Sequence, residues 1–331
     1  MNRIVAIGAL ALLLCHVAAA RADAETPPVC RGKDLTHIAG LAAARAQRID
    51  DLINGDGLLW RIDKPGVAAS YLYGTVHSTD DAALAMASRA AKQIVGAKVV
   101  ATELGGPMDA AEKANMGAAM LARALDRDHD TFDDAPAMDR AEIEKLVAGQ
   151  GYPTQFAHHL KLWFLAILTA IPQCETKRQA LDLPEVDQFL AESARASGVK
   201  VIALETAEEQ LDALSAMSPD VAAALLAVAA RDPARNDDVY ATMLKLYRES
   251  RPAEILPIAD MAGAMSERER AAADEFIRLL LVGRNATMAK RLEAPLKEGG
   301  AFVAVGALHL PGKDGLIERL RAEGYTVSKV W

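Results

Sequence analysis

Four short apolar segments of this sequence each end near a side chain that can bind a metal ion or move a proton. These side chains are His77, Glu103, Glu205 and His309. Both histidines stand three positions after a glycine, in a Gly-x-x-His pattern. Two imidazoles and one or two carboxylates form a common ligand set for a divalent metal ion that activates water. The same groups also suit a metal-free site in which a carboxylate orients a histidine base.

These side chains can meet only if the segments before them are strands of one sheet. Short apolar or alternating runs predict strands at residues 58–62, 69–74, 98–102, 199–204, 301–305 and 325–330. The carboxyl ends of parallel strands share one edge of a sheet, and ligands bind in the crevice there. We therefore expect the four residues to converge, and we expect each glycine to let the backbone turn tightly out of its strand.

The remainder of the chain has the apolar spacing of helices. Helices are predicted at residues 35–52, 81–95, 140–147, 154–171, 252–262, 267–281, 284–297 and 314–322, and others fill residues 108–125, 185–197 and 207–246. Residues 25–331 contain no long linker or low-complexity tract. The sequence therefore predicts one α/β domain with a strand-end crevice and a large helical insertion at about 108–197 and 207–297.

The first 24 residues have the pattern of a secretory signal peptide. A basic start, Met1-Asn2-Arg3, precedes an apolar run of 17 residues, and Ala22 and Ala24 suit cleavage before Glu25. An uncleaved membrane anchor is the alternative, because 17 residues is the lower limit for a span. We expect cleavage, export to the periplasm or beyond, and no stable membrane span afterwards.

Removal of this segment leaves two cysteines, Cys30 and Cys174. In an exported protein an even pair suggests a disulfide, here between an N-terminal tail and the loop after an apolar helix. The alternative is two unrelated thiols, and the distance between them decides.

Composition and charge narrow the class of protein and its partners. The chain has 331 residues, of which 51% are hydrophobic and 25% charged, the mix of a soluble globular protein. The net charge of -8 leaves no broad basic surface to neutralise phosphates, which argues against nucleic acid as a partner. A peptide or a small molecule remains as the substrate class.

Several blocks of the sequence resemble the TraB/PrgY/GumN family, which is related to the Tiki proteases. The matching blocks, in order, are Leu59 to Ile62, Ser70 to His77, Thr102 to Leu104, Val186-Asp187, Leu204 to Thr206, Glu209 to Leu211, Arg284-Asn285, Met288 to Arg291 and Val303 to Gly315. The resemblance spans about residues 58–330. No single block is specific, but together and in this order they are.

The resemblance implies an erythromycin-esterase-like α/β fold with both Gly-x-x-His motifs and a glutamate at one active site. Tiki members are similar to metal-dependent proteases that use manganese or cobalt, which implies His77, Glu103 and His309 as site residues. One departure concerns Asp187, because Glu185 stands two positions before it where the family commonly has glycine.

The leading hypothesis is an exported hydrolase that depends on a divalent metal ion (manganese, cobalt or zinc), with peptidase activity as one option. His77, Glu103 and His309 would hold the metal or its water, Glu205 would orient a ligand, and Arg284 would stabilise an oxyanion. A metal-free esterase-type site with a histidine base is one alternative. A noncatalytic protein that binds a peptide or haem in the same crevice is the other.

Overall fold

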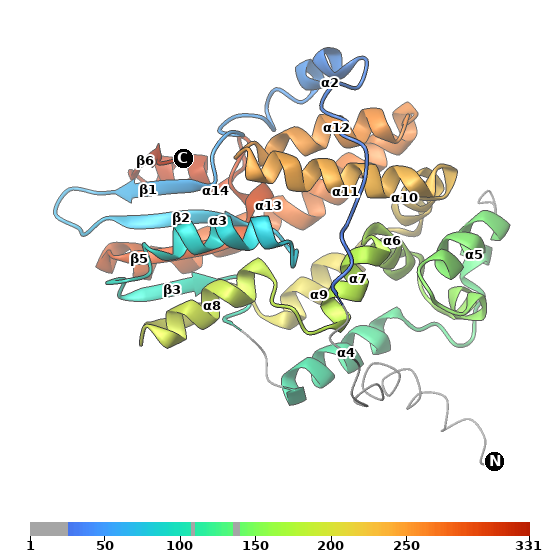
Figure 1. Cartoon of the computed structure of the whole chain (residues 1–331), viewed down its shortest axis with the longest axis horizontal. Coiled ribbons are helices and arrows are strands. Elements are labelled where there is room, and N and C mark those ends of the chain that lie inside the picture. Colours follow the sequence, from blue (N-terminus) through green and yellow to red (C-terminus); the bar gives the residue numbers. More distant parts are fainter. Residues whose placement is uncertain (1–25, 107–109, 135–139) are drawn as a thin grey trace.

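A computed structural model describes residues 26–106, 110–134 and 140–331 of the chain. One sheet lies at one end of the molecule and most of the inserted helices lie at the other (Figure 1). The expected signal peptide falls outside the described residues, as does the start of the helix expected from residue 108.

The sheet has six strands in the order β4-β3-β5-β2-β1-β6. Their bounds are β1 Leu59–Asp63, β2 Ser70–Thr75, β3 Val99–Thr102, β4 Lys200–Ala203, β5 Ala301–Gly306 and β6 Thr326–Lys329. Strands β4, β3, β5 and β2 are parallel to one another, whereas β1 pairs antiparallel with both β2 and β6. All six expected strands are confirmed, and the four that lead to the candidate residues run in one direction.

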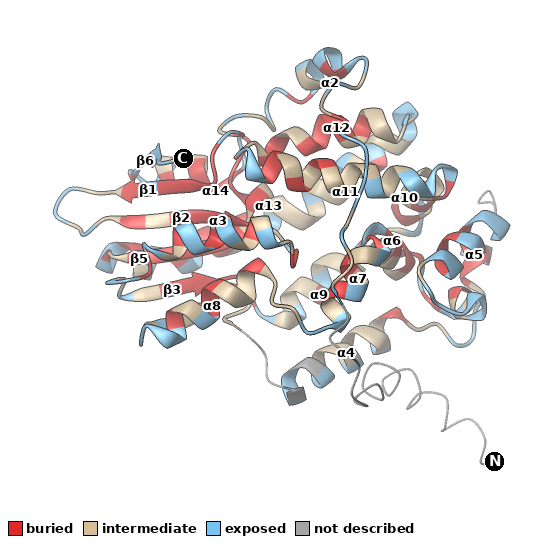
Figure 2. Ribbon diagram, viewed as in Figure 1, coloured by how far each residue is buried: buried red, intermediate tan, exposed pale blue. Residues whose placement is uncertain are grey.

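Helices cover both faces of this sheet. Helices α3 (Asp81–Ala91) and α8 (Val186–Ala196) pack on the face that carries Tyr73 and Phe302. Helices α13 (Glu267–Glu298) and α14 (Leu316–Ala322) pack on the opposite face. Because successive side chains of a strand point to opposite faces, both faces need apolar residues, and buried positions run along the strands (Figure 2).

The short helix η4 (Ala307–His309) directly follows β5, and the remaining helices lie before β1 or in two insertions. Helix α2 (Leu41–Gln47) precedes the sheet. Between β3 and β4 lie α4 (Ala110–Ala124), η1 (Thr131–Asp134), α5 (Arg140–Gly149), η2 (Thr154–His159), α6 (Leu162–Ala170), α7 (Gln173–Ala180) and α8. Between β4 and β5 lie α9 (Ala207–Ser215), α10 (Pro219–Arg231), α11 (Pro233–Arg248), η3 (Pro252–Glu254), α12 (Ile255–Ala262) and α13. Helices α5, α6 and α10 share a second apolar core, which confirms the α/β fold with a helical insertion.

Several helical predictions differ from the structure. The run expected over 207–246, with a break near Pro233, has a further break at residues 216–218 between α9 and α10. Only residues 41–47 of the expected helix 35–52 are α-helical, and the expected helix 154–171 is divided into η2 and α6. Two expected helices, 267–281 and 284–297, form the single helix α13 across Gly283. One internal glycine costs a helix only about 1 kcal/mol, which packing offsets. Residues 173–180, expected to be a loop, form α7.

Cys30 and Cys174 form a disulfide, with their Cα atoms 5.2 Å apart. The bond joins the extended N-terminal segment to α7, so the prediction of a disulfide is confirmed and the alternative of two separate thiols is wrong. Such bonds are typical of oxidising compartments.

No single helix among the described residues is long and apolar enough to cross a membrane. Helices α9 and α10 together meet the same criterion of length and composition, with a bend of 82° between them.

The disulfide closes a long loop and should therefore stabilise the fold. Replacing both cysteines (Cys30→Ser with Cys174→Ser) is expected to lower the free energy of unfolding by about 2–4 kcal/mol, because 144 positions separate the two residues and the unfolded chain regains that freedom. Urea unfolding of the oxidised protein and of the double variant measures the difference. Equal midpoints would contradict the expectation, and the reduced wild type serves as the control that should match the variant.

Candidate active site

The strand order places the four candidate residues in a row along one edge of the sheet. Glu205, Glu103, His309 and His77 follow the parallel neighbours β4, β3, β5 and β2 in that spatial order. Adjacent strands lie about 4.8 Å apart, so side chains at neighbouring strand ends can touch. His77, Glu103 and His309 line one cavity together with Arg284 from α13.

Two buried carboxylates share one guanidinium at this edge. Arg284 Nη2 lies 2.8 Å from Glu103 Oε2 and 2.7 Å from Glu205 Oε2, and Arg284 Nε also donates to Glu205. Gln210 Nε2 donates to the same oxygens of Glu103 and Glu205. The glutamate side chains are only 6% and 2% exposed, so the arginine balances charges that water cannot solvate.

The other oxygen of Glu103 faces the second Gly-x-x-His motif. The Gly306 N–H donates to Glu103 Oε1 over 2.6 Å, and His309 Nε2 lies 3.7 Å from the same oxygen. Glu103 therefore contacts Arg284 through one oxygen and the second histidine motif through the other.

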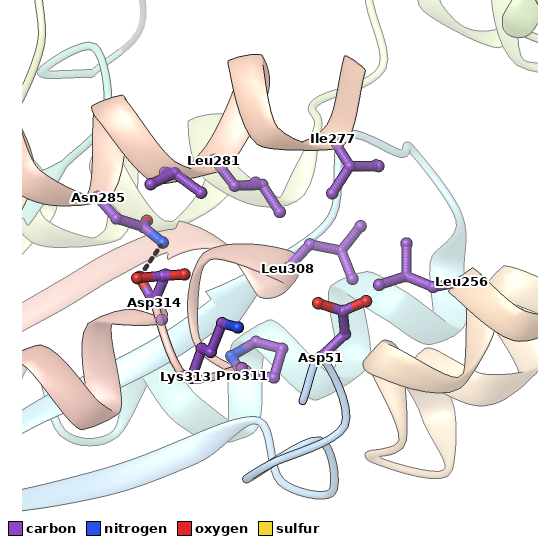
Figure 3. A pocket seen from close by; sticks show the side chains of 12 residues that line it. Asp51, Leu256, Ile277, Leu281, Asn285, Leu308, Pro311, Lys313 and Asp314 are labelled. Carbon is purple, nitrogen blue, oxygen red and sulfur yellow. Dashed lines mark hydrogen bonds between the residues drawn. The ribbon is translucent and has the colours of Figure 1, made fainter. Parts of the chain in front are cut away.

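His309 is held in one tautomer by the residue after Arg284. Its Nδ1 lies 2.7 Å from Asn285 Oδ1, and since an amide oxygen only accepts, Nδ1 carries the proton and donates. The amide nitrogen of Asn285 donates to the Asp314 carbonyl, which sets the orientation of the amide (Figure 3). In the neutral ring, Nε2 consequently carries no proton, and it lies 3.7 Å from Glu103 Oε1.

His77 has very different surroundings. Its side chain is 65% exposed, whereas that of His309 is 4% exposed. His77 Nδ1 lies 3.4 Å from Asp187 Oδ2 and 3.6 Å from Glu185 Oε2. Thr75 donates its hydroxyl to the other oxygen of Asp187, which fixes that carboxylate beside the ring.

The two histidines consequently have pKa values that move in opposite directions. Burial lowers the pKa of His309 from 6.5 to about 4, because an imidazolium is poorly solvated there. Asp187 and, after it, Glu185 raise the pKa of His77 well above 6.5. Burial alone would raise the pKa of Glu103, but the groups around it, His309 first, lower the pKa to about 2.

The motif glycines serve close approach, which corrects the expectation of a tight turn that needs glycine dihedrals. Gly306 has an ordinary φ of -49°, and Gly74 lies within strand β2. A Cβ atom on Gly74 would lie 2.9 Å from Ala307 Cα, so the two motifs pack directly against each other. A Cβ on Gly306 would lie 3.2 Å from Glu103 Oε1.

Two adjoining cavities meet at the histidine and glutamate side chains. The larger, about 560 Å³, has mostly apolar walls, which include Ile171, Met243, Ile255, Leu280, Leu281 and Leu308. The smaller, about 150 Å³, shares His77, Glu103 and Glu185 with it. A third cavity of about 70 Å³ lies beside Asn285, and Leu281 and Leu308 line both this cavity and the largest one (Figure 3).

No group of three His, Cys, Asp or Glu side chains within residues 26–106, 110–134 and 140–331 is arranged to hold a metal ion. Among the candidate residues, His309 Nε2 and Glu103 Oε1 lie 3.7 Å apart.

Sequence reasoning missed three residues that organise the site: Asn285, Glu185 and Gln210. Asn285 directly follows Arg284 in the sequence, and this position on the same predicted helix could have indicated that it also lies in the site. Glu185 was noted only as a departure from a family pattern, yet it lies beside His77. Gln210 lies in the block Glu209-Gln210-Leu211, which resembles the family, but the resemblance by itself implies no role for it.

The fold and the site define a class: an α/β protein that gathers two histidines, two glutamates and an arginine at the carboxyl edge of four parallel strands. Residues 58–329 match the model of the TraB/PrgY/gumN family. The chain belongs to that family, as its sequence motifs predicted. None of the curated proteins matches the chain.

The opposed histidine pKa values can be tested in the metal-free protein. Proton–carbon NMR over pH 3–10 should show His309 titrating near pH 4 and His77 well above 6.5. Between pH 6.5 and 4, His309 is protonated in the unfolded chain but remains neutral in the folded protein. Protonation therefore favours the unfolded state, and the free energy of unfolding decreases as the pH falls through this window. A His309 midpoint at or above that of His77 would contradict the account.

The charge balance at Glu103 and Glu205 gives a stability prediction. Arg284→Met leaves both buried carboxylates without their cation and should lower the free energy of unfolding by about 3–5 kcal/mol. Lys297→Met on the same helix removes a cation from the exposed pair with Glu293 and should cost less than about 1 kcal/mol. Denaturant unfolding compares the variants, and equal losses would show that Arg284 does not balance buried charge.

Proposed function

We propose that this protein is an exported hydrolase that works with one divalent metal ion (manganese, cobalt or zinc) held by His77, Glu103 and His309. The export expected from the N-terminal sequence is supported by the Cys30–Cys174 disulfide. Its substrate would be a peptide or a small molecule that enters the large cavity.

The observation that carries this proposal is the environment of the Nδ1 atom in each of the two imidazole rings. Each histidine has its Nδ1 beside a protein acceptor: Asn285 for His309, and the Asp187 and Glu185 carboxylates for His77. Metal-binding histidines commonly have one ring nitrogen held in this way, which orients the ring and leaves the other nitrogen for the ion.

The second support is the pair of electron-rich atoms that face each other. Near neutral pH, Glu103 is ionised and His309 is neutral, as their pKa values of about 2 and 4 require. Glu103 Oε1 and His309 Nε2, neither of which then carries a proton, lie 3.7 Å apart. A cation relieves this contact, and a mixed nitrogen and oxygen donor set suits the three metals named. A bound ion would act as a Lewis acid and lower the pKa of water.

The residues around these donors have separate roles in the proposal. Asn285 and Asp187 orient the two imidazole rings, and Glu205 orients Arg284. Arg284 keeps Glu103 ionised and, since it also lines the cavity, stabilises negative charge that develops on the substrate. The apolar wall accepts an apolar part of the substrate and limits the access of water.

A metal-free esterase-type site is the second candidate. It is favoured by the lack of a prepared three-ligand group among the described residues and by the low pKa of His309. A neutral His309, oriented by Asn285, has an available Nε2 that could accept a proton from water.

Metal titration of the apo protein, prepared by chelation, tests the leading candidate. Calorimetry with Mn²⁺, Co²⁺ and Zn²⁺ should show one site for at least one ion, and the double variant His77→Ala/His309→Ala should lose it. A matched double change of two exposed histidines, His37→Ala/His159→Ala, should leave binding intact. Retention of the metal by the site variant would contradict the ligand assignment.

Hydrolysis separates the two candidates. Products from a panel of peptide amides and esters should disappear on exhaustive chelation and return with the ion. Turnover that survives chelation would instead select the metal-free site, and tight binding without any turnover would exclude both hydrolases.

A further inference from the structure

The two residues after His77 are fully buried although the histidine side chain itself is exposed. Ser78 and Thr79 are 0% exposed, so their polar groups need protein partners. Val186 N–H donates to the Ser78 carbonyl, and the Tyr240 hydroxyl donates to Ser78 Oγ. Local backbone groups supply two more partners, because the Ser78 N–H donates to the Val76 carbonyl and the Asp80 N–H donates to Ser78 Oγ. Helix α7, which the proposed chemistry does not use, binds both residues as well.

Glu175 of α7 accepts the Thr79 N–H over 2.8 Å, and its second carboxylate oxygen lies 3.5 Å from Ser78 Oγ. The residue is only 1% exposed. A buried carboxylate is costly unless it is hydrogen-bonded, so its position indicates a specific task in this segment.

Arg178, one turn further along α7, binds the other side of the same residue. Its Nε donates to Thr79 Oγ1 over 2.8 Å, and its Nη2 donates to the Thr79 carbonyl over 2.7 Å. Together with Glu175 it therefore engages the N–H, the carbonyl and the hydroxyl of Thr79. Because Thr79 lies two residues after His77, these hydrogen bonds fix the backbone that follows β2 and carries His77.

Helix α7 also reaches the carboxylates beside the ring. Gln179 Nε2 donates to Glu185 Oε1 over 2.9 Å, and Glu185 Oε2 lies 3.6 Å from His77 Nδ1. The helix thus holds both the backbone that carries His77 and a carboxylate that orients it.

The far side of α7 is anchored covalently. The helix has eight residues, too few to be stable alone in water. Cys174 next to Glu175 is bonded to Cys30, and Arg178 Nη1 donates to the Pro28 carbonyl over 3.3 Å. The N-terminal segment therefore fixes α7, and α7 in turn fixes the residues that follow His77.

We propose that Glu175 and Arg178 are positioning residues for His77, and that the Cys30–Cys174 bond fixes the helix through which they act. The inference rests on the proposed role of His77 in the active site. The inference connects the disulfide and two buried charged residues of α7 to the orientation of His77.

The test compares the two histidines within one molecule. The variants are Glu175→Ala, Arg178→Ala, the conservative Glu175→Gln, and Lys177→Ala as an exposed control on the same helix. Proton–carbon NMR of the metal-free protein should show the His77 ring signal displaced or broadened in both alanine variants of the buried charges, with the His309 signal unmoved. Glu175→Gln retains an acceptor for Thr79 N–H and should restore the wild-type signal, and Lys177→Ala should leave both signals in place.

A second measurement is Mn²⁺ affinity, followed by electron paramagnetic resonance of the free ion. Loss of a residue that orients a ligand should weaken binding at least about tenfold in the alanine variants and much less in Glu175→Gln. Reduction of the disulfide should shift the His77 signal in the same direction.

The outcomes separate this inference from the proposed function. An unmoved His77 signal in both alanine variants would overturn the positioning role, as would equal movement of the His309 signal, which indicates general loosening. If the wild type binds no Mn²⁺, Co²⁺ or Zn²⁺, the metal site is contradicted, while the His77 signal still decides whether α7 positions the ring. If an alanine variant fails to fold, Glu175→Gln, Lys177→Ala and the reduced wild type provide the comparison.

Discussion

The site depends on keeping one carboxylate, Glu103, ionised inside the protein. A buried charge is tolerated only when paired and hydrogen-bonded, and Glu103 obtains this from Arg284, Gln210 and the Gly306 N–H. Each partner constrains its own element: α13 must cross the strand ends to bring Arg284, and β5 must lie next to β3. A side chain at residue 306 would push on this carboxylate, because its Cβ would lie 3.2 Å from Glu103 Oε1. The parallel order β4-β3-β5-β2 satisfies these demands together.

The two Gly-x-x-His motifs then give two unlike histidines. One is buried, neutral and oriented by an amide; the other is exposed and set beside carboxylates that favour its charged form. This asymmetry arises from the helices rather than from the motifs. Helix α13 supplies Asn285 to His309, whereas α8 supplies Asp187 to His77. A pair of similar strand ends can thereby present one nitrogen each to a shared cavity while the rings are oriented independently.

The sheet and the convergence of His77, Glu103, Glu205 and His309 at its edge could be predicted from the sequence, because the short apolar runs before these residues carry the strand pattern locally. The disulfide could be proposed but not decided, since only the fold brings Cys30 near Cys174. Helix α7 lacks an apolar pattern because six of its eight residues are polar, and it is stabilised by distant partners, including Thr79 and Cys30. Asn285 and Gln210 act through long-range hydrogen bonds, which periodicity does not reveal. The glycines illustrate a subtler failure: their importance was evident, but close approach, not backbone torsion, is the reason.

The most direct test of the central claim is a crystal structure of the protein soaked with Mn²⁺, with data collected so that the anomalous scattering locates the ion. The account predicts one ion in contact with Glu103 Oε1 and the Nε2 atoms of His309 and His77, with both Nδ1 atoms still facing their protein acceptors. An ion bound elsewhere, or an occupied site in which a histidine is flipped to use Nδ1, would contradict it. A fully soaked crystal with no anomalous peak at this edge of the sheet would do so equally.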